Sequence, residues 1–278
     1  MKGKPLAERI RAAVAEQVTQ IGRIGLVTVL VGDDPASDVY IRLKHKAAIA
    51  AGFDATDLRL PEETTEVELL AKLADLNVSD DVDAILVQLP LPDHFDEARI
   101  IRAVTPSKDV DGFHPLNAGE QYLGRPALVS ATPRGIMALL AEHRISVDGA
   151  RAVVIGRSAI VGRPVSMLLQ QANATVTLCH SHTRDLARHT LEADVLVVAA
   201  GVPMLVTREM VRAGSVVVDV GMNHTEAGLV GDVDPGAAEI AAFMTPVPGG
   251  VGPMTIACLL ENAVQCARYR RGELAYPG

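Results

Sequence analysis

Residues 151–164 have the sequence Arg-Ala-Val-Val-Ile-Gly-Arg-Ser-Ala-Ile-Val-Gly-Arg-Pro, which predicts a strand, a tight turn and the start of a helix. Further short apolar runs follow at 175–178, 195–199 and 215–220, each between helical stretches. This alternation is typical of a doubly wound α/β domain with a parallel sheet.

The turn after the first of these strands has features of a nucleotide site. Its spacing is G-x-S-x-x-x-G, which departs from the G-x-G-x-x-G dinucleotide fingerprint, so an ordinary strand-to-helix turn remains an alternative. A serine hydroxyl can donate to a phosphate, and the N-terminus of a helix offers free N–H groups and a positive dipole end. The residues we expect to bind the cofactor here are Gly156, Arg157, Ser158, Val161, Gly162 and Arg163.

The end of the next strand favours NADP over NAD. NAD sites commonly place Asp or Glu about twenty residues after the turn, to bind the ribose hydroxyls. Residues 178–184 are Leu-Cys-His-Ser-His-Thr-Arg, without an acid before Asp185. Ser181, the two histidines at 180 and 182, and Arg184 suit a 2′-phosphate instead. His180 and His182 could be metal ligands, but a third ligand is missing nearby, so we expect no metal.

The N-terminal half predicts a second α/β unit with polar residues at its strand ends. The loops after the expected strands 25–31 and 83–88 emerge at the same edge of a parallel sheet, where such sheets bind ligands. Tyr40 and Lys44 are four residues apart on the following helix and therefore lie together. Gln88 ends the later strand, held by a stiff Leu-Pro-Leu-Pro loop. A half-buried tyrosine, a solvated lysine and a structural glutamine remain the alternative.

Asp109 and Asp111 alternate along an expected extended turn, so only one of them can face a given site. Paired acids before glycine suggest metal or acid/base chemistry, whereas turn-forming aspartates are the alternative. Residues 117–133 carry few helical signals and are expected to connect two domains. The expected domains are 1–129 together with 256–278, which includes a final helix, and 130–255.

Composition excludes several classes of protein. The 278 residues include 26 Lys and Arg against 34 Asp and Glu, and a net charge of −8 argues against nucleic-acid or anionic-membrane partners. Cys179, Cys258 and Cys266 are odd in number and form no C-x-x-C, which indicates buried thiols of a reducing compartment. Without a signal-peptide core or a bilayer-spanning apolar run, we expect a soluble, cytoplasmic protein.

Seven motifs occur in order along the chain. They are V-G-x-x-P-A-S-x-x-Y-x-x-x-K-x-K (31–46), Q-L-P-L-P-x-H (88–94), K-D-V-D-G-F-H-P-x-N-x-G (108–119), G-R-S-x-I-V-G-R-P (156–164), V-D-V-G-x-N (218–223), G-D-V-D (231–234) and P-V-P-G-G-V-G-P-M-T (246–255). With these motifs the sequence resembles the bifunctional methylenetetrahydrofolate dehydrogenase/methenyltetrahydrofolate cyclohydrolase family. The resemblance covers nearly the whole chain; it departs at Ala131, where the family commonly has Cys, and in a short N-terminus.

The resemblance implies two α/β domains flanking a cleft, the second a Rossmann-type nucleotide-binding domain. It implies NADP-dependent oxidation of 5,10-methylenetetrahydrofolate to the methenyl compound, then hydrolysis to 10-formyltetrahydrofolate, in the one-carbon metabolism that serves purine biosynthesis. A homodimer built through the nucleotide domains is also implied. Alternatives are a folate dehydrogenase without the hydrolytic step, another two-domain NADP dehydrogenase of the shikimate type, and a nucleotide-sensing protein.

The resemblance also implies roles for single residues in the folate site. Tyr40 would stack on the aminobenzoyl ring, Asp111 would accept hydrogen bonds from the pterin, and Leu89 would line the site. The wall where pterin meets nicotinamide would consist of Pro248, Gly249 and Gly250, whose glycines allow close approach of the backbone.

In the same family pattern, Lys44 would relay protons during hydrolysis, and Met222 would lie beside the nicotinamide ribose or ring. A free lysine titrates near ~10.4, so burial would have to lower the pKa of Lys44. Gln88 would orient Lys44 by a hydrogen bond without adding the negative charge that would keep the amine protonated.

Overall fold

The computed structural model of this chain describes residues 1–32, 35–125, 127–226 and 228–277, with the backbone alone for residues 35–40. The described chain divides into two compact units. The five-stranded unit comprises Met1–Glu8 and Ser130–Cys258, and the three-stranded unit comprises Arg9–Val129 and Leu259–Gly278. Each has its own parallel sheet and its own hydrophobic core, as the α/β prediction requires.

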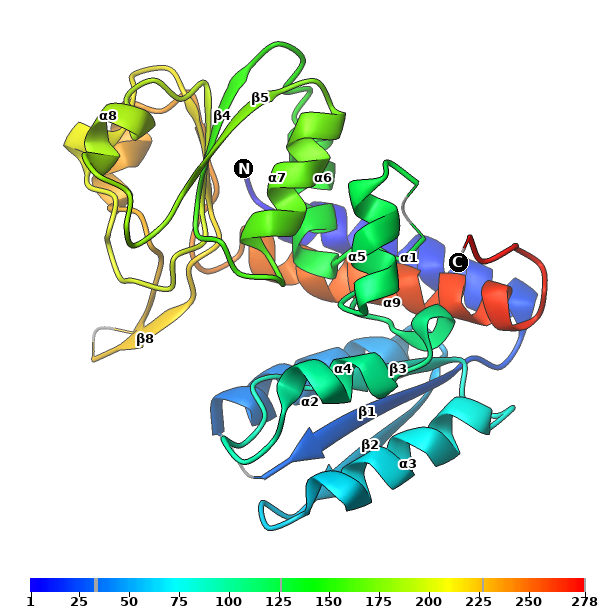
Figure 1. Ribbon diagram of the computed structural model, residues 1–278. Coiled ribbons are helices and arrows are strands. Elements are labelled where there is room, and N and C mark those ends of the chain that lie inside the picture. The colour runs from blue at the N-terminus through cyan, green and yellow to red at the C-terminus, as the bar shows by residue number, and fades with distance from the viewer. Residues whose placement is uncertain (33–34, 126, 227, 278) are drawn as a thin grey trace. The chain divides into compact units, whose positions relative to one another are not determined.

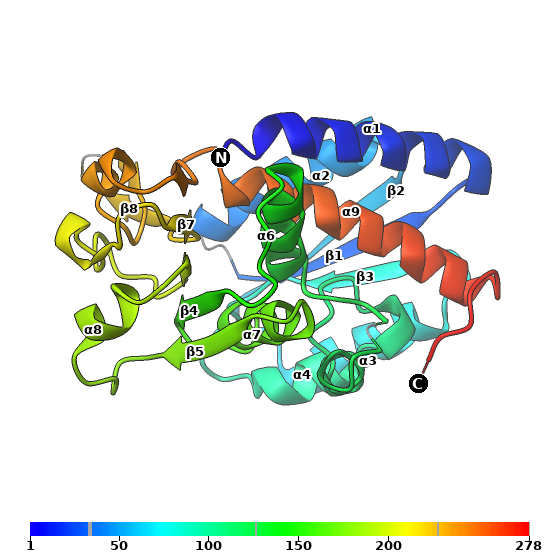
Figure 2. The same ribbon diagram turned by 90° about the horizontal axis from the view of Figure 1, so that it is seen from above.

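The three-stranded unit is built around β1 (Gly25–Val31), which lies between β2 (Asp54–Leu60) and β3 (Ala84–Val87) (Figure 2). Both pairings are parallel, and β1 pairs with β2 along its whole length. Every residue of β1 is buried, because both faces of a parallel strand are covered. This explains why the sequence of β1 is a continuous apolar run rather than an alternating one.

Helices cover the three-stranded sheet. Aliphatic side chains from α3 and α4 share one core with alternate residues of β1 and β3, and α2 contacts β2. α1 and α9 each contain a boundary between the two units. The helical bounds are α1 (Lys4–Ile21), α2 (Pro35–Ala50), α3 (Glu66–Val78), α4 (Glu97–Ala103), η1 (Pro106–Lys108), α5 (Pro115–Tyr122) and α9 (Val251–Arg270).

The five-stranded unit has the strand order β10-β7-β6-β4-β5, with all neighbours parallel. From β4 the chain adds β5 on one side and later strands on the other, so the order reverses between β4 and β6. α7 lies against β4 and β5 and also contacts α6 (Figure 1). The strands are β4 (Arg151–Ile155), β5 (Thr175–Cys179), β6 (Val195–Val198), β7 (Val216–Asp219) and β10 (Phe243–Met244).

The opposite side of this sheet is covered by the connections after β5, β6 and β7, whose apolar residues share a core with β4, β6 and β7. β8 and β9 form a separate antiparallel hairpin. The remaining elements are α6 (Ala131–Glu142), α7 (Gly162–Gln171), α8 (Leu186–Thr190), η2 (Arg208–Met210), β8 (Asn223–Thr225), β9 (Gly228–Val230) and η3 (Pro235–Glu239). Helices on one face and connections on the other make this a doubly wound sheet.

One local prediction was wrong at the start of the expected connector. Residues 117–122 belong to α5, which has Pro115 in its first turn and His114 accepting the N–H of Leu116 at its N-terminus. The helix escaped detection because the residues it buries are polar, including Asn117 and Glu120, so it lacks an apolar stripe.

The ends of the expected domains also differ from the units that the structure shows. Met1–Glu8 and residues 256–258 group with the five-stranded unit. The reason at the N-terminus is direct contact, since the N–H of Gly3 donates to the carbonyl of Gly249 at 2.9 Å. α9 begins at Val251, five residues before the expected helix, because Pro253 is tolerated in a first helical turn. Among the described residues, the structure contains no helix with the length and apolarity that a membrane crossing requires.

Candidate functional site

A lysine, an amide and a carboxylate come together in the three-stranded unit. Lys44 lies on α2, Gln88 directly follows β3, and Asp111 lies in the turn after η1. The Nζ of Lys44 donates to the Oε1 of Gln88 at 3.1 Å. Gln88 in turn donates through Nε2 to the carbonyl of Leu89 at 2.6 Å, which leaves Oε1 as the atom that faces the amine.

The electrostatic surroundings of Lys44 act in opposite directions. Burial lowers the pKa of Lys44, whereas the negative charge of Asp111 opposes the shift by raising that pKa. Burial likewise raises the pKa of Asp111, and the positive charge of Lys44 opposes this shift. Because Gln88 is neutral, it holds the amine without adding charge. The cluster therefore brings a lysine toward the neutral form that can accept a proton.

The two aspartates of the expected turn have different surroundings. Asp111 interacts with Lys44, whereas the buried Asp109 accepts the backbone N–H of His114 at 2.7 Å and Nδ2 of Asn117 at 2.9 Å. The turn closes with the N–H of Gly112 donating to the carbonyl of Asp109 at 3.2 Å. Gly112 has φ +69°, a conformation that glycine adopts without strain. Asp109 is thus the turn-forming aspartate and Asp111 the one in the cluster.

Tyr40 is part of α2, one turn before Lys44, and its side chain lies outside the described residues. Helical geometry alone puts the two residues on neighbouring positions of one face. In the five-stranded unit, Pro248, Gly249 and Gly250 form the connection between β10 and the start of α9. Gly250 is buried, and a Cβ added there would lie 2.6 Å from the carbonyl oxygen of Pro246, so a side chain has no room.

The turn between β4 and α7 forms a narrow cradle of backbone. Gly156 has φ +112°, and a Cβ on it would overlap the carbonyl oxygen of Ala199 at the end of β6. A Cβ on Gly162 would overlap the carbonyl oxygen of Gly156. Both glycines are therefore required by close approach of the backbone. The turn also lies where the strand order reverses, which is the position where doubly wound sheets bind nucleotides.

Ser158 connects this turn to the helix. Its Oγ accepts the N–H groups of Val161 at 3.2 Å and Gly162 at 3.3 Å. In both of these bonds the oxygen is the acceptor, so they do not use the hydroxyl hydrogen. Arg157 and Arg163 are exposed on either side. A phosphate placed here would meet a hydroxyl donor, the N-terminus of α7 and two guanidinium groups.

Two more of the expected cofactor residues follow other strands of the same sheet. Ser181 is exposed after β5, and Met222 is exposed after β7. Because all these strands are parallel, the loops that carry Gly156, Ser181 and Met222 leave the sheet at one edge. Within the part of the chain that the structure describes, no three His, Cys, Asp or Glu residues are arranged to hold a metal ion.

Two family models match the chain. One, described as the catalytic domain of tetrahydrofolate dehydrogenase/cyclohydrolase, matches residues 1–111, and the other, described as its NAD(P)-binding domain, matches residues 130–271. The chain belongs to this family. The first match contains the Lys44–Gln88–Asp111 cluster, and the second contains the turn at Gly156 and the five-stranded sheet.

Similar proteins include close members of the tetrahydrofolate dehydrogenase/cyclohydrolase family. A bifunctional protein FolD of Acidiphilium cryptum is 54% identical over 272 residues, which cover 97% of this chain and 98% of that one. The crystal structure of bifunctional enzyme FolD from Campylobacter jejuni is 45% identical, with a TM-score of 0.95 over 97% of this chain and 98% of that one. The Trypanosoma brucei enzyme, complexed with NADP cofactor and inhibitor, is 38% identical, with a TM-score of 0.93 over 99% and 98%.

The family motifs V-D-V-G-x-N and G-D-V-D contain two buried carboxylates whose contacts sequence reasoning did not identify. Asp219 accepts the N–H groups of Gly221 and Asp232 at 2.9 Å and of Val233 at 3.1 Å. Asp232 accepts the N–H of Ala200 at 2.7 Å, just after β6. These bonds connect the ends of β6 and β7 to the segment after β9. The position of both acids within glycine-containing motifs was the signal in the sequence that could have identified them.

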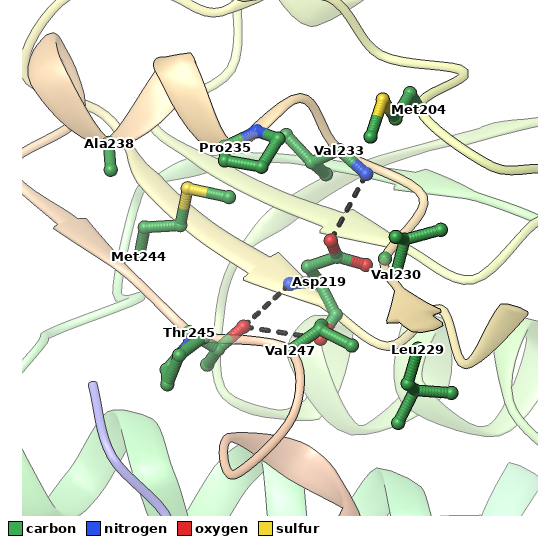
Figure 3. Close-up of a pocket in the computed structure, with 12 residues that line it drawn as sticks. Met204, Asp219, Leu229, Val230, Val233, Pro235, Ala238, Met244, Thr245 and Val247 are labelled. Atoms are coloured by element: carbon green, nitrogen blue, oxygen red, sulfur yellow. Dashed lines mark hydrogen bonds between the residues drawn. The ribbon is translucent and has the colours of Figure 1, made fainter. Parts of the chain in front are cut away.

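Asp219 also forms part of the wall of a pocket of about 400 Å³ within the five-stranded unit. Figure 3 shows its carboxylate beneath the N–H of Val233, with Thr245 on the other side hydrogen-bonded to its backbone. Apolar side chains such as Met204 and Met244 form much of the remaining wall. Because both carboxylate oxygens accept backbone N–H groups, we assign Asp219 to the support of the fold.

Proposed function

We infer that this chain is a bifunctional, NADP-dependent methylenetetrahydrofolate dehydrogenase and methenyltetrahydrofolate cyclohydrolase. It oxidises 5,10-methylenetetrahydrofolate to 5,10-methenyltetrahydrofolate and hydrolyses that product to 10-formyltetrahydrofolate. The observation that carries this conclusion is the bond from Lys44 to Gln88 beside Asp111, within the residues that the catalytic-domain model matches. A dehydrogenase lacking the second activity would have no use for a lysine whose pKa is lowered by burial and whose amine is held by a neutral amide.

The cofactor site fits a dinucleotide phosphate. NADP, when bound, supplies the acceptor for the hydride that leaves the methylene bridge. The glycines at 156 and 162 let the backbone come close, Ser158 donates to a phosphate oxygen, and Arg157 and Arg163 balance the negative charge. Ser181 binds the 2′-phosphate at the end of β5, Val161 lines the phosphate turn, and Met222 contacts the nicotinamide end.

Hydride loss needs only positioning by the protein, since the folate nitrogens supply the electrons. Their lone pairs form the delocalised methenyl cation as the hydride departs. Asp111 accepts hydrogen bonds from the pterin N–H groups, Tyr40 stacks on the aminobenzoyl ring and Leu89 borders the site. Because binding has already fixed the reactants in this geometry, the reaction step itself loses little further motional freedom.

Hydrolysis needs proton transfers, and these define the role of Lys44. Water adds its oxygen to the cationic carbon as the neutral amine of Lys44 takes one proton. The bond from that carbon to N5 of the folate then breaks, and N5 receives the second proton. The sum is methenyltetrahydrofolate plus water giving 10-formyltetrahydrofolate and one released proton. Gln88 keeps the amine aimed at the carbon, and burial lowers the pKa of Lys44, which favours the neutral form that accepts a proton.

We further propose that the three-stranded unit, with residues 256–258, binds the folate, and that the five-stranded unit binds NADP. The family matches support this division, because the catalytic-domain match ends at residue 111 and the NAD(P)-binding match begins at residue 130. A homodimer formed through the five-stranded unit, a cytoplasmic location and a supply of 10-formyltetrahydrofolate for purine biosynthesis complete the proposal. Gel filtration with light scattering tests the dimer.

The deciding experiment compares Lys44→Met with the wild-type enzyme in two separate assays. One follows NADP reduction with methylenetetrahydrofolate, and the other follows decay of added methenyltetrahydrofolate above its spontaneous hydrolysis. The variant should lose hydrolysis, and any surviving hydride transfer would separate the two steps. A variant that hydrolyses the methenyl compound as fast as wild type would remove Lys44 from the mechanism. A wild-type protein without either activity would overturn the proposed function.

A further inference from the structure

The turn that carries Asp111 is fixed by distant parts of the three-stranded unit. Val110, the residue before Asp111, donates its N–H to the carbonyl of Ile85 on β3 at 3.3 Å. The carbonyl of Val110 accepts Nδ2 of Asn262, on α9, at 2.9 Å. The backbone immediately before Asp111 is therefore bonded on both sides.

Asp109, which begins the same turn, is held by Asn117. The fully buried Asn117 amide donates through Nδ2 to Asp109 Oδ2 and also to the carbonyl of Pro106, both at 2.9 Å. Both hydrogens of the amide are thereby used. The orientation of Asn117 thus depends on what its remaining atom, Oδ1, contacts.

That contact comes from the segment that follows α9, coloured red in Figure 1. The hydroxyl of Tyr276 donates to Oδ1 of Asn117 at 2.7 Å. Burial raises the pKa of Tyr276 to about 12, so the phenol remains a donor at neutral pH. The ring of Tyr276 meets that of Tyr269 edge-on, with centroids 5.2 Å apart. A continuous chain of bonds therefore runs from Tyr276 through Asn117 to the turn of Asp111.

We propose that Tyr276 is a positioning residue of the folate site, which acts through Asn117 and Asp109 to hold Asp111 in the orientation that binds the pterin. The inference rests on the proposed role of Asp111. Removing the phenol hydroxyl leaves a buried amide oxygen without its donor, and the amide then gains freedom to turn. Because hydrogen bonds in a chain strengthen one another, the bond to Asp109 weakens as well. The turn loosens, and the pterin must order it on binding.

The test uses the full chain with Tyr276→Phe and the matched control Tyr269→Phe. The control removes a hydroxyl from the same aromatic pair, where Tyr269 contacts Gln265 and Ala127 rather than Asn117. Binding of tetrahydrofolate is measured by anaerobic calorimetry, and KM for methylenetetrahydrofolate and for NADP by absorbance. Loss of one buried hydrogen bond predicts that Tyr276→Phe weakens folate binding about three- to tenfold. KM for NADP stays at the wild-type value, and the control binds folate as wild type does.

A double-mutant cycle with Asp111→Asn distinguishes positioning from general loss of stability. If Tyr276 acts through Asp111, Tyr276→Phe should cause no further loss of folate binding once Asp111 is replaced. An equal loss in both backgrounds, or a lone Tyr276→Phe that binds folate as wild type does, overturns the inference. If Asp111→Asn binds too weakly to measure, the comparison of the two Phe variants decides. Wild-type protein that binds no folate would instead disprove the proposed function.

Discussion

Replacing Gln88 by Glu puts a carboxylate where Lys44 now meets a neutral amide. The two atoms are 3.1 Å apart, so the new charge would lie in direct contact with the amine. Two unit charges about 4 Å apart interact by about 1 kcal/mol in water and by about 4 kcal/mol at an effective dielectric constant of ~20. Lys44 is half-buried, which puts it between these limits. At about 1.4 kcal/mol per pKa unit, the pKa of Lys44 should rise by about one to three units.

The assay is the rate of methenyltetrahydrofolate hydrolysis as a function of pH, without NADP and after subtraction of the spontaneous rate. Since the neutral amine takes the proton, hydrolysis in Gln88→Glu should require a pH higher by the same one to three units. At neutral pH the rate should fall about ten- to thousandfold. Gln88→Met is the matched control, because it removes the hydrogen bond without adding charge. Its rate should fall without an upward displacement of the pH profile.

A Gln88→Glu enzyme whose profile superposes on that of wild type, or moves to lower pH, would refute this reasoning. The first result would mean that the amine titrating in the assay is not Lys44. The second would mean that the Glu carboxyl is itself protonated and that its burial outweighs its pairing with the amine. Measuring NADP reduction in the same variant shows whether the protein still binds folate, so loss of the site is recognised separately.

Three further outcomes are expected. Gly156→Ala forces a Cβ against the carbonyl of Ala199, so KM for NADP should rise at least about tenfold, equal to about 1.4 kcal/mol. Hydrolysis of added methenyl substrate should continue in this variant. Unchanged NADP kinetics would contradict the role of the turn between β4 and α7 as a backbone cradle for the cofactor. Ser181→Asp should repel the 2′-phosphate and raise KM for NADP more than KM for NAD, and a parallel change in both would count against this site. Burial raises the pKa of Asp109 to about 7, so the folded state binds the proton more tightly than the unfolded state and stability should fall as pH rises from about 4 to 7. The free energies of unfolding of wild type and Asp109→Asn, measured in urea, should diverge over that pH range by about 1 to 4 kcal/mol. If the two free energies change in parallel with pH, Asp109 is not the cause of the loss of stability.

β1 and β6 were predictable because every residue of each is buried, as expected for strands covered on both faces. Their sequences are nearly continuous apolar runs for that reason, and the expected ranges agree with the structure to within one residue. The order of the strands also placed Lys44 and Gln88 at one edge of a sheet before any distance was known. α5 could not be found in this way, because it buries the polar Asn117 and Glu120, whose partners lie elsewhere in the chain.

Contacts between distant segments were beyond the reach of the sequence. Asp232 bonds to Ala200, and Tyr276 bonds to Asn117, and neither pair has a local spacing that would indicate the contact. The resemblance to a family marked the position of Asp232 without giving its physical role. Such residues are visible only when the backbone groups they satisfy are known, since a buried carboxylate requires donors that the fold must bring to it.

Contacts from distant segments also explain how Lys44 can both lose its own proton and take a proton from water. A fully desolvated amine without a carboxylate nearby would lose its proton readily but would have weak affinity for the proton it must take from water. A lysine in direct contact with a carboxylate would stay charged. In the structure, the neutral Gln88 makes the direct hydrogen bond, and Asp111 opposes the effect of burial by its charge. If Asp111 also binds the pterin, substrate contacts that disperse its negative charge would weaken its hold on the lysine proton. Binding of the folate would then lower the pKa of Lys44 further, at the moment when a neutral amine is needed.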